Sequence, residues 1–206
     1  MSPGSALRVR GMHAALVLLG YSLAACAARG HIATADEVAR LKQASGLSAS
    51  GRLTLTGPQG RFSTRVVFGV ARPDSLRIEI PSGTGLRFLL VATRGKLRAD
   101  LPQDDAMFAG PGTADVMKRL FGVDVEPKDL VGALLGSPPE SLPVSWRFEG
   151  ARPTQVTLQG SDGARLSLTF DDPEIEPPSD RAFSFGPPRS RSWTLSEMSD
   201  RLGLVR

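Results

Sequence analysis

The chain has 206 residues, of which 41% are hydrophobic and 22% charged, and it contains 22 glycines, 16 prolines and a single cysteine. This composition is typical of one turn-rich globular domain, and it argues against a helical bundle or a disordered chain. The formal net charge of +4, with both signs mixed along the chain, is too small to supply the many phosphate contacts that nucleic-acid binding needs. We therefore expect no nucleic-acid partner.

Residues 1–25 have the order of a secretory signal peptide. Arg8 and Arg10 precede an apolar run at 14–20 that is too short to span a bilayer, and Leu-Ala-Ala-Cys ends at Cys26. This tetrapeptide resembles the lipobox of bacterial lipoproteins, which implies cleavage before Cys26 and lipidation of its thiol. The alternative is an ordinary cleavage that leaves an unpaired thiol, since a lone cysteine forms no internal disulfide. Several acyl chains hold a protein on a membrane, because each buried methylene contributes about 0.8 kcal/mol.

A lipidated linker is expected at 26–33, and a short helix follows it at 34–44. Thr34 is in the N-cap position, and Asp36 and Glu37 are in the first turn. Beyond this helix the hydrophobic period changes to two, which predicts strands separated by Gly- or Pro-containing turns. The alternating segments are 51–56, 61–70, 76–80, 86–90 and 97–101. Short turns of this kind join antiparallel neighbours.

Two short amphipathic helices interrupt the strand pattern in the middle of the chain. The first is predicted at 113–121 and ends at Gly122, and the second is predicted at 127–135 and begins at Pro127. Strands then resume around the hairpin turn signal Asp162-Gly163. The later elements are strands at 144–148, 156–158, 166–170 and 182–185, then a C-terminal tail at 188–206 with a short helix at 194–201.

Nearly every predicted strand has one apolar face, so the expected fold of 34–187 is mainly β with helices: a curled antiparallel sheet, or half-open β-barrel, covered by short lid helices. A curled sheet under movable helices would enclose an apolar cavity, and on a lipid-anchored protein the expected cargo is acyl chains. The alternative is that the same side chains fill a core without a cavity. The residues expected to line the cavity are Leu53, Leu55, Phe68, Leu76, Ile78, Phe88, Leu90, Trp146, Phe148, Leu168 and Phe170. Those expected on the lid are Met117, Leu120, Phe121 and Leu134.

Four short segments follow the first predicted helix in the sequence: SGRLTL at 50–55, RPDSLRIE at 72–79, ATRGKL at 92–97 and PEIEPP at 173–178. With the two mid-chain helices, they resemble the LolA/LolB periplasmic lipoprotein-localisation family. The resemblance implies a half-open antiparallel barrel whose concave apolar side accepts the acyl chains of lipoproteins. It also implies an arginine that latches the lid, and this position matches Arg72 of the Arg72-Pro73 step. An exposed turn arginine is the alternative for Arg72.

The lipobox makes the chain more similar to the lipid-anchored receptor of that family than to its soluble carrier. In the enterobacterial sorting scheme, a residue such as Ala27 after the cysteine favours the outer membrane, facing the periplasm, over the inner membrane. The implied partners are acyl chains of lipids or lipoproteins, the membrane itself and a soluble periplasmic carrier. The receptor's protruding leucine has no counterpart here, because the corresponding turn is 81–85 and Leu86 lies only at its end.

No catalytic site, metal site or cofactor is predicted. His13 belongs to the signal peptide and His31 to the linker, so no Ser-His-Asp, Cys-His or metal cluster is expected. Asp104-Asp105 and Asp171-Asp172 are adjacent carboxylates that are poorly placed to converge on one bond. The chain is therefore expected not to be an enzyme. Two hypotheses follow: an acyl-chain binding and transfer protein, and a structural or adaptor lipoprotein whose arginine-rich tail, 189–206, contacts an envelope partner.

Overall fold

The structure is a computed structural model that describes residues 30–58, 60–160 and 163–203. The predicted signal peptide and Cys26 lie outside these residues. Within them, one eleven-stranded sheet has the strand order β1-β8-β9-β10-β2-β3-β4-β5-β6-β7-β11. Neighbouring strands are antiparallel except for β7 and β11, which are parallel.

The strands are β1 (His31–Ile32), β2 (Gly46–Gly57), β3 (Gly60–Ala71), β4 (Ser75–Ser82), β5 (Gly85–Thr93), β6 (Lys96–Leu101), β7 (Ala106–Pro111), β8 (Val144–Glu149), β9 (Arg152–Gln159), β10 (Arg165–Glu174) and β11 (Arg191–Ser192). The α-helices are α1 (Ala35–Gln43), α2 (Ala114–Phe121), α3 (Pro127–Leu134) and α4 (Leu195–Leu202). Short 3-10 turns lie at Pro102–Asp104 and Asp180–Phe183.

Local sequence signals set the ends of the helices. Thr34 and Glu37 form a capping box at the start of α1, which satisfies backbone N–H groups that the helix leaves free. Helix α2 ends at Gly122, whose φ of 72° is a left-handed conformation that glycine adopts without a steric cost. Pro127 is the first residue of α3, where its missing N–H is not needed. The predicted helices α1, α2 and α3 are therefore present to within about a residue at each end, and α4, predicted at 194–201, begins and ends one residue later.

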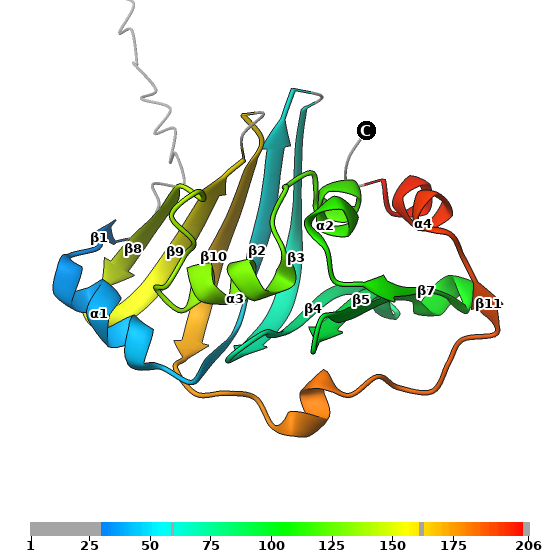
Figure 1. Cartoon of the computed structure of the whole chain (residues 1–206), viewed down its shortest axis with the longest axis horizontal. Coiled ribbons are helices and arrows are strands. Elements are labelled where there is room, and N and C mark those ends of the chain that lie inside the picture. Colours follow the sequence, from blue (N-terminus) through cyan, green and yellow to red (C-terminus); the bar gives the residue numbers. More distant parts are fainter. Residues whose placement is uncertain (1–29, 59, 161–162, 204–206) are drawn as a thin grey trace, which may run out of the picture.

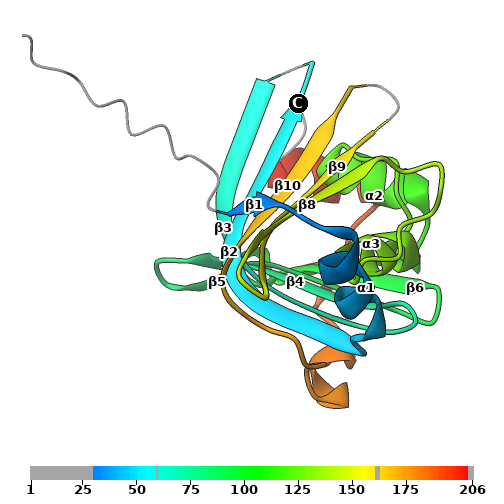
Figure 2. The same cartoon turned by 90° about the vertical axis from the view of Figure 1, so that its left-hand side faces the viewer.

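The sheet remains open, because its edge strands β1 and β11 do not pair with each other in the described part of the chain. The prediction of a mainly β fold with helices is confirmed, but the strong curl of a half-barrel is not observed. Neighbouring strands differ in direction by about 20° through their right-handed twist. Over the whole sheet this twist turns β4–β7 well away from the direction of β8–β10, and α2 and α3 cover the apolar face (Figures 1 and 2).

The register makes one face of the sheet apolar from strand to strand. Phe68 of β3 lies opposite Ile78 of β4, which lies opposite Leu90 of β5, and Leu90 lies opposite Ala99 of β6. Side chains alternate between faces along a strand, so these positions share the face that the helices cover. We call this the inner face. Among the described residues no helix has the length and apolar character needed to cross a membrane.

The segment after β10 returns across the opposite face, which we call the outer face. Residues 175–187 form this strap, which runs below the sheet in Figure 1. Pro178 lies over Gly69, where an added Cβ would be 2.6 Å from the proline ring, so a larger residue would displace the strap. Arg98 of β6 donates to the carbonyls of Gly186 and Pro187, each at 2.6 Å. A 3-10 turn, Asp180–Phe183, stands where the strand at 182–185 was predicted.

Residues 188–203, expected to belong to a tail, are packed onto the domain. Strand β11 pairs with β7, and α4 lies beside α2 at the right of Figure 1. Met198 is fully buried and Leu202 is 3% exposed, so α4 contributes to the same core as the strands. A single core therefore extends from the strands near the N-terminus to α4.

Candidate functional site

The candidate site is the inner face together with the lid, by which we mean α2 and α3. The apolar side of α2 consists of Val116, Met117, Leu120 and Phe121, and that of α3 consists of Leu130, Val131, Ala133 and Leu134. Each exposes 5% or less of its surface. Neither helix exceeds eight residues, a length at which an isolated helix is not stable in water. The lid therefore depends on its contacts with the sheet.

The structure brings most of the predicted lining residues together in one core under the lid. Nine of them are buried there: Leu53, Leu55, Phe68, Leu76, Ile78, Phe88, Leu90, Leu168 and Phe170. Trp146 is half-buried and packs against the same core. The four predicted lid residues, Met117, Leu120, Phe121 and Leu134, also belong to it.

Phe148 departs from the prediction. It is buried but lies outside that core. A bulge between Arg147 and Phe148 shifts the register of β8, so that Phe148 pairs with Pro153 and with His31 of the edge strand β1. A bulge adds one residue to one strand and changes the alternation of faces beyond it. Period-two counting along β8 therefore gives the wrong neighbours for this residue.

The packing beneath the lid is tight. Phe88, Leu90, Met117 and Leu134 expose 0% of their surface. A void that could hold a water molecule would leave accessible area on the residues around it, so no such void touches these side chains. Phe88 of β5 also meets Phe121 of α2 edge to face, with ring centroids 6.1 Å apart. Around these residues the lid therefore packs directly onto the sheet.

Arg72 lies at the end of β3 and connects the strand to two helices. Its Nε donates to the carbonyl of Ala44 at 2.9 Å, and its Nη2 donates to the carbonyls of Lys42 and Leu135, each at 3.0 Å. Lys42 and Ala44 end α1, whereas Leu135 is the C-cap of α3. Carbonyls at a helix C-terminus lack partners within the helix and carry partial negative charge, so a guanidinium is a suitable donor. The side chain is nevertheless exposed to solvent.

Trp146 gives the lid a second polar contact. Its indole Nε1 donates to the carbonyl of Ala133 in α3 at 3.0 Å. The residue itself lies on β8, so this bond connects α3 to the strand at the other side of the inner face. Helix α3 is thus held by apolar contacts along its length and by two side-chain donors near its C-terminal end.

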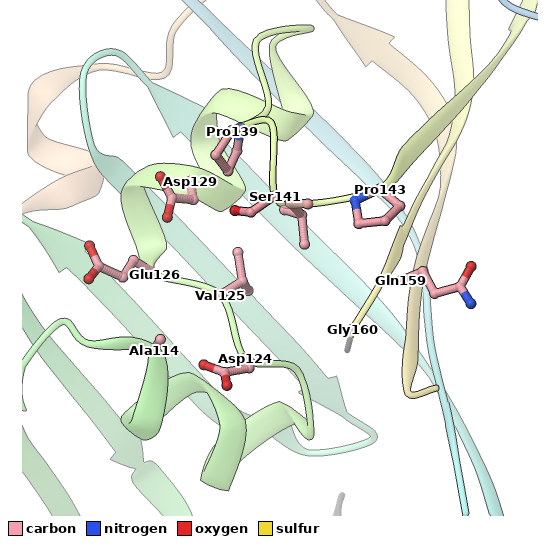
Figure 3. Close-up of a pocket in the computed structure, with 11 residues that line it drawn as sticks. Ala114, Asp124, Val125, Glu126, Asp129, Pro139, Ser141, Pro143, Gln159 and Gly160 are labelled. Carbon is pink, nitrogen blue, oxygen red and sulfur yellow. The ribbon is translucent and has the colours of Figure 1, made fainter. Parts of the chain in front are cut away.

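A cavity of about 350 Å³ opens beside the N-terminal end of α3 (Figure 3). Its apolar lining comes from Val125 and Leu142, with Pro139 and Pro143 nearby. Its polar lining includes three carboxylates, Asp124, Glu126 and Asp129. Lys118 pairs with Asp124 and Lys128 pairs with Glu126. The hydrogen bond that Lys128 donates to Glu126 raises the pKa of Lys128. None of the predicted lining residues borders this cavity.

Three of the four carboxylates in the two adjacent Asp pairs have side-chain partners in the described part of the chain. Arg201 of α4 donates to Asp104 at 2.8 and 3.0 Å, and this hydrogen bond lowers the pKa of Asp104. Asp105 accepts from Ser190, and Asp172 accepts from Arg152 at 3.0 Å. In the described part of the chain, no group of three or more His, Cys, Asp or Glu residues is arranged to hold a metal ion.

Sequence reasoning missed the contribution of α4 to the site. Met198 and Leu202 are part of the core that the lid residues form. Ser199 also donates to the carbonyl of Arg119 in α2 at 2.8 Å. The available signal was the capping box of Thr194 and Glu197, which marks a well-defined helix but does not say where it packs.

The fold and the site define a mainly β protein in which short helices close over the apolar face of one open sheet. No family model and no curated protein matches the chain. Among solved structures, it is similar to a LolA superfamily protein from Nitrosomonas europaea, with 10% identity, a TM-score of 0.45, and coverage of 74% of this chain and 98% of that one. It is also similar to an uncharacterized conserved protein from Thermus thermophilus, with 10% identity, a TM-score of 0.41, and coverage of 77% and 94%. A third similar structure is a putative outer membrane lipoprotein-sorting protein domain from Vibrio parahaemolyticus. It has 9% identity and a TM-score of 0.35, and the match covers 68% of this chain and 89% of that one.

Proposed function

We propose that this chain is a lipid-anchored protein of the cell envelope that binds the acyl chains of lipoproteins or lipids between its sheet and its lid. The observation that carries the proposal is the contact of Arg72 with the ends of α1 and α3. One exposed side chain holds α3 against the end of β3 through hydrogen bonds to backbone carbonyls. Water can replace such bonds, so the lid can open without breaking a buried ion pair.

The chemistry of the inner face supports the same function. An acyl chain that replaced α3 would exchange one apolar surface for another, so the hydrophobic stabilisation of the sheet, about 25 cal/mol per Å², would be largely retained. The buried side chains of α3 include Leu130, Val131 and Leu134, which are aliphatic and similar in character to an acyl chain. Opening at α3 would therefore depend mainly on the side-chain donors that hold this helix, which are Arg72 and Trp146.

The anchor and the location rest on the N-terminal sequence. Cleavage before Cys26 would leave the lipidated residue four positions before Gly30, where the described chain begins. The Ala27 that follows it favours the outer membrane, facing the periplasm. A protein held there would receive acyl chains from a soluble periplasmic carrier and assist their transfer into the membrane.

The test uses the mature chain without its lipid, from Ala27 to Arg206. Mass spectrometry of the purified protein identifies any lipid that co-purifies, and titration with a fluorescent fatty acid measures the affinity. We expect saturable binding at micromolar concentration or below. If no lipid co-purifies and the fatty acid does not bind, acyl-chain binding is wrong.

The tight packing beneath the lid favours a second candidate, a structural or adaptor lipoprotein. Side chains such as Leu90 and Leu134, which are fully buried, suit a permanent core as well as a closed lid. Cross-linking in cells distinguishes the two. A specific protein partner that is retained after Phe88→Leu and Trp146→Phe would favour the adaptor, because neither substitution alters the protein surface greatly.

A further inference from the structure

The outer face carries a group of arginines that the acyl-chain site does not use. Arg52 of β2, Arg61 and Arg65 of β3, and Arg165 of β10 are all exposed. Their side chains make no ion pair and no hydrogen bond within the described part of the chain. We call these four residues the arginine patch.

The register places the four arginines on the same face of three neighbouring strands. Arg52 lies directly opposite Arg65, and Thr56 lies opposite both Arg61 and Arg165. Adjacent strands are about 4.8 Å apart, and every second residue of a strand lies about 7 Å further along the same face. Arg61 and Arg165 therefore lie about 14 Å along the face from Arg65 and Arg52, with the row of Thr54, Ser63 and Ser167 between them. The arginine patch spans three neighbouring strands and three rows of the sheet.

The arrangement carries an energetic cost. Like charges directly opposite each other on neighbouring strands are destabilising, by a few tenths of a kcal/mol up to about 1 kcal/mol. The other outward side chains of these rows on the three strands are Thr54, Thr56, Ser63, Ser167 and Thr169. Glu79 of the next strand, opposite Val67, lies diagonally from Arg65 but is paired with Arg77. The first outward carboxylate along β10 is Asp171, opposite Ser50 and beyond the end of the patch. A surface that keeps unpaired like charges together suits an anionic partner.

The strap leaves this part of the outer face uncovered. It crosses β3 at Gly69 and β6 at Arg98, whereas the arginine patch lies toward the free ends of the hairpins β2–β3 and β9–β10. Those ends project at the top of Figure 1, on the side away from the strap. The lid helices are on the opposite face. The patch is therefore free to meet a partner while the lid is closed or open.

The length of the N-terminal connection indicates which partner is near. From Cys26 to Gly30 the chain spans at most about 14 Å, because an extended residue covers about 3.5 Å. Arg147, an outward residue of β8, donates to the carbonyl of Gly30 at 3.0 Å and so fixes the start of the described chain at this strand. A lipid anchor at Cys26 would keep the sheet within reach of the lipid headgroups at all times.

We infer that the arginine patch binds the phosphate groups of anionic phospholipids and so sets how the domain lies on its membrane. The inference rests on the anchoring in the proposed function, and it adds the surface that faces the bilayer. A cation near an anionic membrane contributes about a factor of five in binding. When the patch contacts the membrane, the lid lies on the face turned away from it, so an arriving carrier can reach the lid.

Vesicle sedimentation tests the inference, using the mature chain from Ala27 to Arg206 without lipid. This chain contains all of the described residues that form the core. The vesicles are phosphatidylcholine alone or phosphatidylcholine with phosphatidylglycerol. We expect binding only to the vesicles with phosphatidylglycerol, and weaker binding at high salt because ions screen exposed charges. Equal binding to both kinds of vesicle, or binding to neither, would overturn the inference.

Two variants with the same change of charge separate the patch from net charge. The first replaces Arg52, Arg61, Arg65 and Arg165 by Gln, and the second replaces the exposed residues Arg40, Lys96, Arg119 and Lys128 by Gln. We expect the first to lose at least about a hundredfold in affinity for anionic vesicles, and the second to lose less than about tenfold. Equal losses would mean that net charge alone acts, and an unchanged first variant would mean that the arginines serve another partner, such as an acidic protein. Either result overturns the inference.

Fatty-acid titration of the same proteins keeps the two proposals distinguishable. The patch lies on the face opposite the lid, so the first variant should bind the fluorescent fatty acid as the unchanged chain does. Suppose that no protein bound the fatty acid, while the first variant lost vesicle binding and the second kept it. Acyl-chain binding would then be wrong, and the inference that the arginine patch binds anionic phospholipids would be retained.

Discussion

At the scale of single residues, Arg72 allows a direct comparison between a role expected from the sequence and the contacts found in the structure. The Arg-Pro step suggested a latch by resemblance, and the structure gives its guanidinium carbonyl partners at the ends of α1 and α3. The role of these bonds in lid movement stays a prediction. The side chain is also exposed, as the alternative of an exposed turn arginine requires, so the contacts alone do not decide between the two interpretations.

Removing the latch should favour the open lid. Arg72→Leu removes the hydrogen bonds to α1 and α3, so we expect the affinity for a fatty acid to rise by about tenfold, since each 1.4 kcal/mol shifts an equilibrium tenfold. The same substitution should lower the free energy of unfolding by about 1–3 kcal/mol. Release of the acyl chain to vesicles should slow accordingly. Fluorescence titration, urea unfolding and a transfer assay measure the three effects.

The control for this variant is Arg40→Leu, which removes an exposed arginine of α1. It should leave affinity, stability and release nearly unchanged. If Arg72→Leu bound fatty acid no better than Arg40→Leu, Arg72 would be a structural contact and not a latch.

A second residue-scale prediction concerns the ion pair under the strap. Arg98 and Asp100 are 8% and 4% exposed and are joined by two hydrogen bonds of 2.6 and 3.1 Å. Asp100→Ala leaves the Arg98 guanidinium buried without its counter-ion, which should cost about 3–5 kcal/mol of unfolding free energy. Urea unfolding measures it. The double variant Arg98→Met, Asp100→Leu should recover part of this loss, whereas a loss below about 1 kcal/mol in the single variant would contradict the assignment.

At the scale of elements, local signals explain what the sequence predicted well. Helices α1, α2 and α3 have caps or prolines at their ends, and strands β2 to β6 alternate clearly. Strand β7 was not predicted, because its inward positions are Ala106, Phe108 and Gly110 and two of them are too small to mark a pattern. The strap is rich in proline and has no period, so only its contacts with Gly69 and Arg98 reveal its path.

Helix α4 should loosen in acid. Glu197 accepts from the backbone N–H of Thr194 at 2.7 Å, and this bond lowers its pKa, while the bond from Arg201 lowers the pKa of Asp104. The ordinary pKa values are 4.5 for Glu197 and 3.8 for Asp104, and both are lowered in the folded chain. Each ionised carboxylate therefore stabilises the folded chain above its ordinary pKa, and this stabilisation is lost as the pH falls through the lowered pKa. Hydrogen-exchange protection of α4 should therefore fall below pH 3.8 before that of β2 and β3.

The matched variant for α4 is Asp104→Asn with Glu197→Gln. In this variant, the hydrogen-exchange protection of α4 should be reduced already at neutral pH, as it is expected to be for the unchanged chain in acid. If α4 in the unchanged chain kept its full protection relative to β2 in acid, the two carboxylates would not hold the helix.

At the scale of the whole molecule, the sequence predicted the class of fold and most of the residues that share the core under the lid, but not the shape of the sheet. Alternation identifies the apolar face of each strand, and the same alternation brings Phe68, Ile78 and Leu90 together in the structure. Alternation does not show whether the apolar face is covered by curling of the sheet itself or by helices. It also cannot show whether the interior is filled, because that depends on how α2, α3 and α4 fit together.

The central claim is that an acyl chain can reach the inner face beneath α3. Trp146 is well placed to report this, because its indole contacts Ala133 in α3 and the chain has only one other tryptophan, Trp193. The most direct measurement is the fluorescence of Trp146 in a Trp193→Phe mature chain, titrated with a brominated fatty acid that quenches tryptophan on contact. The account predicts saturable quenching, displaced by the unbrominated fatty acid and stronger in Arg72→Leu. Unchanged fluorescence at concentrations where the fatty acid remains monomeric would contradict it.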